Sequence, residues 1–181
     1  ASRWDYEWQR LYCRGMGEGP SSMPADRIIT REQLACMLLP LADPALRWEG
    51  YDDEDCGDAL RIAVGNGFLA PENRTGPEGH VSGAHAYDHA PRLMPDGHVT
   101  RQEMATVAMQ ACGVNYRNAS STMPVCADAA LVNNNYGTNV ARALYFGFMS
   151  LEPDGCFKPR RPVTIGEAAG ILNRVADFAG I

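Results

Sequence analysis

Apolar residues recur at a helical spacing in three separate parts of the chain. In each part, a threonine is followed by apolar residues four, seven, eight and eleven positions later. This spacing places the apolar side chains on one face of an α-helix, which is then expected to be buried. The three sets are Leu34, Met37, Leu38 and Leu41; Met104, Val107, Ala108 and Ala111; and Ala168, Ile171, Leu172 and Val175. We therefore expect three similar helices packed on a shared axis.

Each of these helices begins with the pattern of a capping box. A threonine is followed three residues later by glutamine or glutamate, at Thr30 and Gln33, Thr100 and Glu103, and Thr164 and Glu167. In a capping box the threonine hydroxyl accepts from the third backbone amide, and the longer side chain accepts from the amide of the cap. This interpretation accounts for the acidic residues as structural caps, without a catalytic role.

A second helix is expected before each capped helix. These stretches end in a glycine followed by a large apolar residue, at Gly15-Met16, Gly67-Phe68 and Gly147-Phe148. Glycine just past a helix adopts the left-handed conformation that ends it. The sequence thus predicts a mainly α fold, with one domain over 1–181 built from three helix-loop-helix repeats. The expected repeats cover residues 1–45, 46–115 and 116–181, and the second carries an inserted loop at 70–93.

Charge and hydropathy exclude two classes of partner. The net charge of the 181 residues is −6, whereas nucleic-acid binding favours a basic surface. No stretch approaches the roughly 20 consecutive apolar residues of a membrane-spanning helix. We therefore expect neither a nucleic-acid partner nor a membrane span.

The six cysteines favour disulfides in an oxidising compartment. They stand at 13, 36, 56, 112, 126 and 156, and none forms a Cys-x-x-Cys pair typical of zinc or redox sites. An even number of cysteines without metal spacing favours disulfides, although buried thiols and a redox role remain open. Cys112 and Cys126 flank one short connection and are the one locally plausible pair.

The ordered set of motifs resembles the S-layer homology family. Its repeat has a helix ending in glycine, a Pro-Asp-Gly-x-Phe-x-Pro turn and a Thr-Arg-Ala-Glu helix start. The segment from Pro153 to Pro159, followed by Val163-Thr164, is similar to the turn and helix start, and Thr100-Arg101-Gln102-Glu103 differs from the signature at one position. The resemblance implies a pseudo-threefold spindle of helices that binds secondary cell-wall polysaccharide, outside the cell at its surface. Ile165 stands where the signature has arginine, so the groove that uses it is expected to bind weakly or not at all.

Arg31 and Arg101 are the main candidates for binding the glycan. Each follows a cap directly and lies at a helix N-terminus, where free amides and the helix dipole favour an anion; the anion that the resemblance implies is a ketal-pyruvate carboxylate. A guanidinium also binds a carboxylate with two hydrogen bonds. The alternative is a pair of solvated surface charges. The resemblance adds further glycan-binding candidates at the turns and in the first helix, namely Asp96, Gly97, Asp154, Gly155, Lys158, Trp4 and Trp8, although the two aspartates are also typical turn formers.

The inserted loop contains the one candidate metal site. His80, His85, His89 and Asp88 fall in one window, and His85 and His89 are spaced to share a helix face. Glycines and a proline nearby argue against a long helix there, so a polar loop without metal is the alternative. No other cofactor is expected.

No motif of an enzyme stands in the sequence. A nucleophile elbow, a phosphate-binding loop and a metalloprotease helix signature are all missing. We therefore expect a non-catalytic anchoring module that binds an anionic cell-wall polysaccharide. The alternative is a disulfide-stabilised structural subunit of an extracellular surface layer or filament, whose partners are further subunits.

Overall fold

The computed structural model describes residues 3–14, 16, 24–43, 45–46, 53–70, 93–113 and 121–180. Within these ranges it contains six α-helices and one short 3-10 helix, so the expected mainly α fold is confirmed. The elements are α1 (Arg3–Cys13), α2 (Arg31–Ala42), α3 (Asp53–Gly65), α4 (Arg101–Ala111), η1 (Ala129–Leu131), α5 (Gly137–Tyr145) and α6 (Ile165–Ala179). No helix of the described part has both the length and the apolar character needed to cross a membrane.

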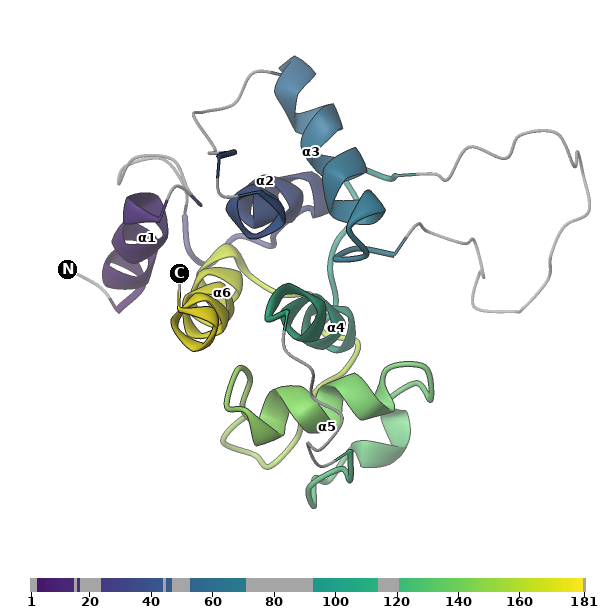
Figure 1. Ribbon diagram of the computed structural model, residues 1–181. Coiled ribbons are helices and arrows are strands. Elements are labelled where there is room, and N and C mark those ends of the chain that lie inside the picture. The colour runs from purple at the N-terminus through teal and green to yellow at the C-terminus, as the bar shows by residue number, and fades with distance from the viewer. Residues whose placement is uncertain are drawn as a thin grey trace, which may run out of the picture.

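The helices pack in a cyclic order. α2 packs on α3, α4 on α5 and α6 on α1, while α4 also contacts both α2 and α6. Figure 1 shows α2, α4 and α6 viewed along their axes near the centre, with α1, α3 and α5 outside them. Each capped helix therefore packs on the helix that follows it in the sequence, and the last capped helix packs on the first helix of the chain. The consecutive helices α3 and α4 do not form one of these three pairs.

Three isolated β-bridges join the segments that lead into the capped helices. The antiparallel bridges pair Thr30 with His98, Thr100 with Pro162, and Thr164 with Ile28. Each cap threonine is thus bridged to the residue two positions before the next cap threonine, and the third bridge returns to the first segment. The three helix starts are held in a closed ring.

The same segments bind the first amides of the capped helices. The N–H groups of Arg31, Arg101 and Ile165 donate to the carbonyls of Gly97, Arg161 and Arg27 at 2.8, 3.0 and 2.8 Å. The next amide of each helix donates to the carbonyl two residues earlier in the same segment, that of Pro95, Pro159 or Ala25. Helix N-termini leave four amides without partners inside the helix, and here neighbouring segments supply two acceptors for each.

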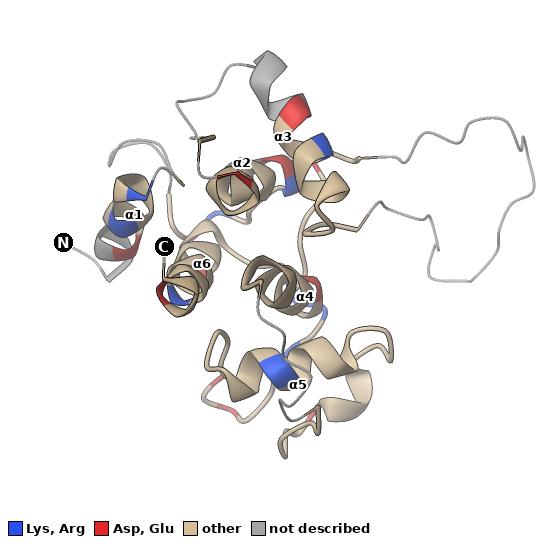
Figure 2. Cartoon of the chain, viewed as in Figure 1, with Lys and Arg blue, Asp and Glu red and all other residues tan. Residues whose placement is uncertain are grey.

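The predicted cap threonines lie at the N-caps of α2, α4 and α6. In α2 the Thr30 hydroxyl accepts from the Gln33 amide at 3.2 Å, and the Gln33 side chain accepts from the Thr30 amide at 3.0 Å. Thr164 and Glu167 make the corresponding bonds at 3.3 and 3.0 Å. At Thr100, both the amide and the hydroxyl donate to the Glu103 carboxylate at 2.7 Å. The charged residues of α2 and α4 stand in the first turn, beside these caps (Figure 2).

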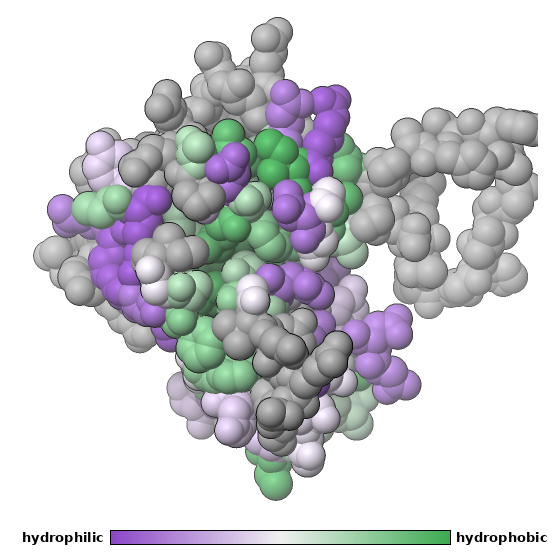
Figure 3. All heavy atoms as spheres, in the orientation of Figure 1, coloured by the Kyte–Doolittle hydropathy of each residue, from purple (hydrophilic) through white to green (hydrophobic). Residues whose placement is uncertain are grey.

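The apolar stripes form the core of the molecule. Of the twelve stripe residues, Leu41 is half-buried and the other eleven are buried. The large residues after the glycine stops, Met16, Phe68 and Phe148, are buried as well, and Gly67 and Gly147 have φ of 74° and 72°. On the face shown in Figure 3, hydrophobic residues gather towards the middle and hydrophilic residues lie mostly towards the outside. Burying each large aliphatic side chain contributes about 2 kcal/mol, so the stripes direct the packing.

A polar cluster on α6 joins the two ends of the chain. Asn173 has no exposed surface, and its side-chain amide donates to the backbone carbonyl and to the carboxylate of Glu7, both at 2.7 Å. The Arg14 guanidinium donates to the Asn173 side-chain oxygen at 2.9 Å. Asp177, one turn later on α6, accepts from Arg10 and Arg14. These contacts hold α1 against α6 and close the cycle of helix pairs.

The structure contains no disulfide between Cys112 and Cys126, the pair that the sequence indicated. No disulfide joins the cysteines whose side chains are described, at 13, 36, 112, 126 and 156. The Cys112 thiol is buried and donates to the Met109 carbonyl at 3.1 Å, whereas the Cys126 thiol donates to the Asp128 carboxylate at 3.3 Å. The two thiols thus donate to acceptors within three residues of their own positions.

Candidate functional site

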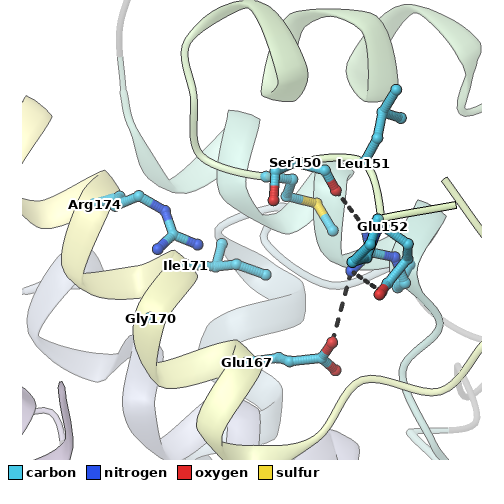
Figure 4. Close-up of a pocket in the computed structure, with 10 residues that line it drawn as sticks. Ser150, Leu151, Glu152, Glu167, Gly170, Ile171 and Arg174 are labelled. Carbon is cyan, nitrogen blue, oxygen red and sulfur yellow. Dashed lines mark hydrogen bonds and ion pairs between the residues drawn. The ribbon is translucent and has the colours of Figure 1, made fainter. Parts of the chain in front are cut away.

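A polar groove lies beside α6 and is called here the α6 groove. Its volume is about 310 Å³. Figure 4 shows Glu167, Ile171 and Arg174 projecting from α6 towards the segment that carries Ser150 and Glu152. The groove is lined by Arg101, Met149, Ser150, Leu151, Glu152, Pro153, Glu167, Gly170, Ile171 and Arg174. It is formed by the start of α4, the segment that follows α5 and one face of α6.

Arg101 forms the floor of this groove and clamps two chain segments. Its Nε donates to the Phe157 carbonyl at 2.6 Å, and one terminal nitrogen donates to the Ser150 carbonyl at 2.7 Å. The guanidinium carbon lies 4.9 Å from the centre of the Phe157 ring, within the range of a cation–π contact. Only 6 % of the residue is exposed. Arg101 is therefore a buried part of the fold as well as a wall of the groove.

Arg31 makes two corresponding hydrogen bonds in another part of the molecule. Its Nε donates to the Leu93 carbonyl at 3.0 Å, and a terminal nitrogen donates to the Ala70 carbonyl at 2.6 Å. It is 5 % exposed. The alternative of a solvated surface charge is therefore wrong for both arginines. Arg31 does not line the α6 groove, so the two main candidates belong to separate sites.

Two carboxylates face the guanidinium of Arg101. Glu152 and Glu167 lie 3.6 and 3.7 Å from its other terminal nitrogen. Arg161 donates to both carboxylates, to Glu152 at 2.8 Å. Burial lowers the pKa of Arg101 and Arg161 lowers it further, whereas the two glutamates raise it. An arginine keeps its charge at neutral pH despite such a shift, so the groove holds both charged donors and charged acceptors.

Glu167 is ionised because its bonds outweigh its burial. Burial alone would raise its pKa, but the bond from Arg161 and the bond from the Thr164 amide together lower it below its ordinary value. The same carboxylate thus caps α6 and lines the groove. A capping role and a ligand-binding role are compatible at this residue, because one oxygen accepts from the Thr164 amide and the other lies 3.7 Å from Arg101, which lines the groove.

Arg174 is a groove residue that the sequence analysis did not single out. It lies on the same face of α6 as Glu167 and Ile171, and its Nε donates to the Phe148 carbonyl at 2.9 Å. It is half-buried. No local signal marks it, since a single arginine in the middle of an amphipathic helix is ordinarily a surface charge. Only the packing of α6 against the segment after α5 places it in a groove.

The amides at the helix starts are not available to a ligand in the way that the sequence suggested. The first two amides of α2 and α4 donate to carbonyls of the neighbouring segments. The dipole of the helix still favours an anion nearby, but a ligand at these sites would have to bind to side chains.

The predicted turn residues lie outside the α6 groove. Asp154 is exposed and pairs with Lys158 at 2.9 Å, and its carboxylate accepts from the Cys156 amide at 3.0 Å. The Gly155 carbonyl accepts from Ala127 at 3.2 Å. Asp96 is exposed, and the carbonyl of Gly97 accepts from Arg31. These contacts are those of turns, and they bring Gly97 together with Arg31 only through the backbone.

Asp128 organises the turn before α6. Its carboxylate accepts from the amides of Phe157 and Lys158, both at 2.7 Å. Burial raises its pKa, but these backbone bonds together lower it below its ordinary value. They also hold Lys158 at a φ of 57°, in the left-handed region. The two amides that Asp128 binds are 29 and 30 positions away in the sequence, so these contacts follow only from the packing.

The remaining candidates lie in the core or outside the described residues. Trp8 is buried among the hydrophobic core residues, so its ring offers no exposed face to a sugar. The side chain of Trp4 lies outside the described residues. The same holds for the possible metal ligands, His80, His85, Asp88 and His89. Among the residues that are described, no three His, Cys, Asp or Glu side chains are grouped to hold a metal ion.

The chemistry of the α6 groove is that of binding polar groups from two sides. Guanidinium groups donate hydrogen bonds and carboxylates accept them, and a ligand rich in hydroxyl groups requires both. An anionic substituent on such a ligand pairs with arginine. Comparison of the chain with models of known protein families and with curated proteins gives no match.

Proposed function

We propose that this chain is a non-catalytic module of three repeats that anchors its carrier to a bacterial cell surface. The repeats form a pseudo-threefold spindle, and the module binds an anionic cell-wall polysaccharide outside the cell. The cyclic packing of the helices supports the spindle. Each capped helix contacts the following helix, and three equivalent bridges join the helix starts in a ring. Such regularity is expected from three copies of one unit.

The observation that carries the proposed function is the composition of the α6 groove. Two arginines, Arg101 and Arg174, and two glutamates, Glu152 and Glu167, line a space of about 310 Å³. Sugar hydroxyls donate to the carboxylates and accept from the guanidinium groups, and a ketal-pyruvate carboxylate pairs with an arginine. Arg174 is the arginine best suited to the anion, because it is half-buried, whereas only 6 % of Arg101 is exposed.

A binding assay with purified cell-wall sacculi tests this function. Wild-type protein is expected to bind intact sacculi and to lose binding when the secondary polymer is stripped. Arg174→Gln removes one charged donor from the groove and is expected to weaken binding at least about tenfold, as for the loss of one charge-assisted hydrogen bond. Arg61→Gln is the matched control, because Arg61 is an exposed residue of α3 and does not line the groove. A folded protein that binds neither preparation contradicts the proposal.

A second candidate is a structural subunit of an extracellular surface layer or filament. The burial of Arg31 and Arg101 favours it, because both side chains already bind backbone carbonyls of the same chain. In that case the arginines serve the fold alone. Assembly of the purified protein into sheets or filaments, without binding to sacculi, is the outcome that separates this candidate from the first.

A further inference from the structure

Cys126 and Cys156 flank one hydrogen bond between two distant segments. The Ala127 amide donates to the Gly155 carbonyl at 3.2 Å. This bond joins the peptide unit that follows Cys126 to the peptide unit that precedes Cys156. In an antiparallel arrangement, residues that flank a bond of this kind form a non-hydrogen-bonded pair with Cα atoms about 4.5 Å apart, and a disulfide requires about 4.4–6.8 Å. The backbone therefore brings the two cysteines within bridging range.

Asp128 aligns the Cys126 thiol with the other segment. One oxygen of its carboxylate accepts from the Cys126 thiol at 3.3 Å and from the Phe157 amide at 2.7 Å. The thiol and the amide that directly follows Cys156 thus share one acceptor atom. The Cys126 sulfur is held beside the backbone of Cys156 and not turned away from it.

Both cysteines are partly exposed. Cys126 and Cys156 are half-buried, whereas Cys36 and Cys112 are 2 % and 4 % exposed. Cys13 is exposed and belongs to α1, which packs on α6. Of the cysteines with described side chains, Cys126 and Cys156 are therefore the two that combine access with a close approach of their segments.

We propose that Cys126 and Cys156 are a modification site, at which a low-molecular-weight disulfide oxidises the two thiols to an intramolecular disulfide. One cysteine attacks the reagent as a thiolate, forms a mixed disulfide and releases one reagent thiol. The second cysteine attacks the mixed disulfide and releases the other reagent thiol. The protein loses two electrons and two protons, and the reagent gains them. This route is ordinary thiol–disulfide exchange.

The bond joins the segment before η1 to the turn before α6. It closes a loop of about 30 residues, which stabilises the fold by restricting the unfolded chain. For a protein of this size, the midpoint of thermal unfolding is expected to rise by about 5–15 °C. The turn that the bond holds also carries Glu152 at its start, so oxidation braces one wall of the α6 groove. The inference does not depend on what that groove binds.

Incubation with oxidised glutathione, followed by peptide mapping without reduction, tests the site. The expected result is one linked pair of peptides that contains Cys126 and Cys156, together with a higher unfolding midpoint that returns to its starting value after reduction. Cys126→Ser and Cys156→Ser are each expected to abolish both effects, whereas Cys13→Ser, a matched control at an exposed cysteine, retains them. Mapping on the wild-type protein does not depend on how the variants fold. Bonds between other cysteines only, or persistence of mixed disulfides at both positions, would overturn the proposal.

Discussion

Replacing Arg101 with methionine is expected to destabilise the fold by about 3 kcal/mol. Methionine keeps much of the apolar length of arginine but removes the guanidinium. The two carbonyls that Arg101 binds, at Phe157 and Ser150, then lose charged donors at 2.6 and 2.7 Å. The perturbation therefore measures how strongly this buried side chain holds the segment after α5 and the turn before α6.

The magnitude follows from the contacts. A hydrogen bond from a charged group contributes about 1.5–3 kcal/mol, and a buried acceptor left without a partner costs a similar amount. The burial of the guanidinium opposes part of this gain, and the glutamates that lose a positive neighbour are partly exposed, so their contribution is small. A net value of about 3 kcal/mol corresponds to a fall of about 6–12 °C in the unfolding midpoint for a protein of this size.

Urea denaturation followed by far-UV circular dichroism measures the change. The midpoint is expected to fall without a change in slope, because the compactness of the two states is unaltered. Arg61→Met is the matched control, since the Arg61 side chain is 72 % exposed, and it is expected to shift stability by no more than about 0.5 kcal/mol. If Arg101→Met and Arg61→Met lower the free energy of unfolding by the same small amount, the hydrogen bonds of Arg101 contribute nothing to stability and the prediction is refuted.

Three further predictions concern other parts of the structure. Arg10 of α1 and Arg14, which directly follows α1, lower the pKa of Asp177, so the stability that these pairs contribute is complete above the ordinary carboxyl pKa and is lost as pH falls below about 4. Asp177→Asn is expected to remove this pH dependence in urea titrations from pH 3 to about 7, and the effect is at most about 1 kcal/mol because Asp177 is half exposed. Asn173→Ala is expected to lower the free energy of unfolding by about 2–3 kcal/mol in the same assay, because it leaves the Glu7 carbonyl and the Arg14 guanidinium without this partner. A loss below about 0.5 kcal/mol would contradict the role of Asn173 in holding α1 against α6. Gly147→Ala is expected to lower the free energy of unfolding by about 1 kcal/mol because of the φ of 72°, since an added Cβ meets nothing within 4 Å. Gly65→Ala is the control, because Gly65 is equally unobstructed but has no positive φ. Equal losses of stability in the two variants would exclude backbone strain as the cause.

The local structure of the capped helices is predictable from sequence. A cap threonine and its partner are three residues apart, and the apolar residues of each stripe fall within about two helical turns. Such patterns depend on contacts between near neighbours, which a single segment determines with little help from the rest of the chain. The positions of the helix starts at Arg31, Arg101 and Ile165, and the burial of their apolar faces, are accordingly those that the sequence indicates.

The role of the arginines after the caps depends on distant parts of the chain. The acceptors of Arg31 are 39 and 62 positions away in the sequence, and those of Arg101 are 49 and 56 away. Sequence identified these residues as special and placed them at helix starts. It could not show that carbonyls from other segments would occupy them, because hydrogen-bond partners at such separations follow only from the packing.

The choice of packing partners divides what sequence can determine from what the tertiary structure decides. Local periodicity specifies which face of each helix is apolar, but any other apolar face satisfies the hydrophobic effect equally well. The three-dimensional arrangement therefore decides that α6 packs on α1, that Arg174 and Glu152 line one groove, and that the segment of Cys126 is bonded to the segment of Cys156. The helices are a property of short segments, whereas the groove and the bond between these segments exist only where parts of the chain far apart in the sequence meet.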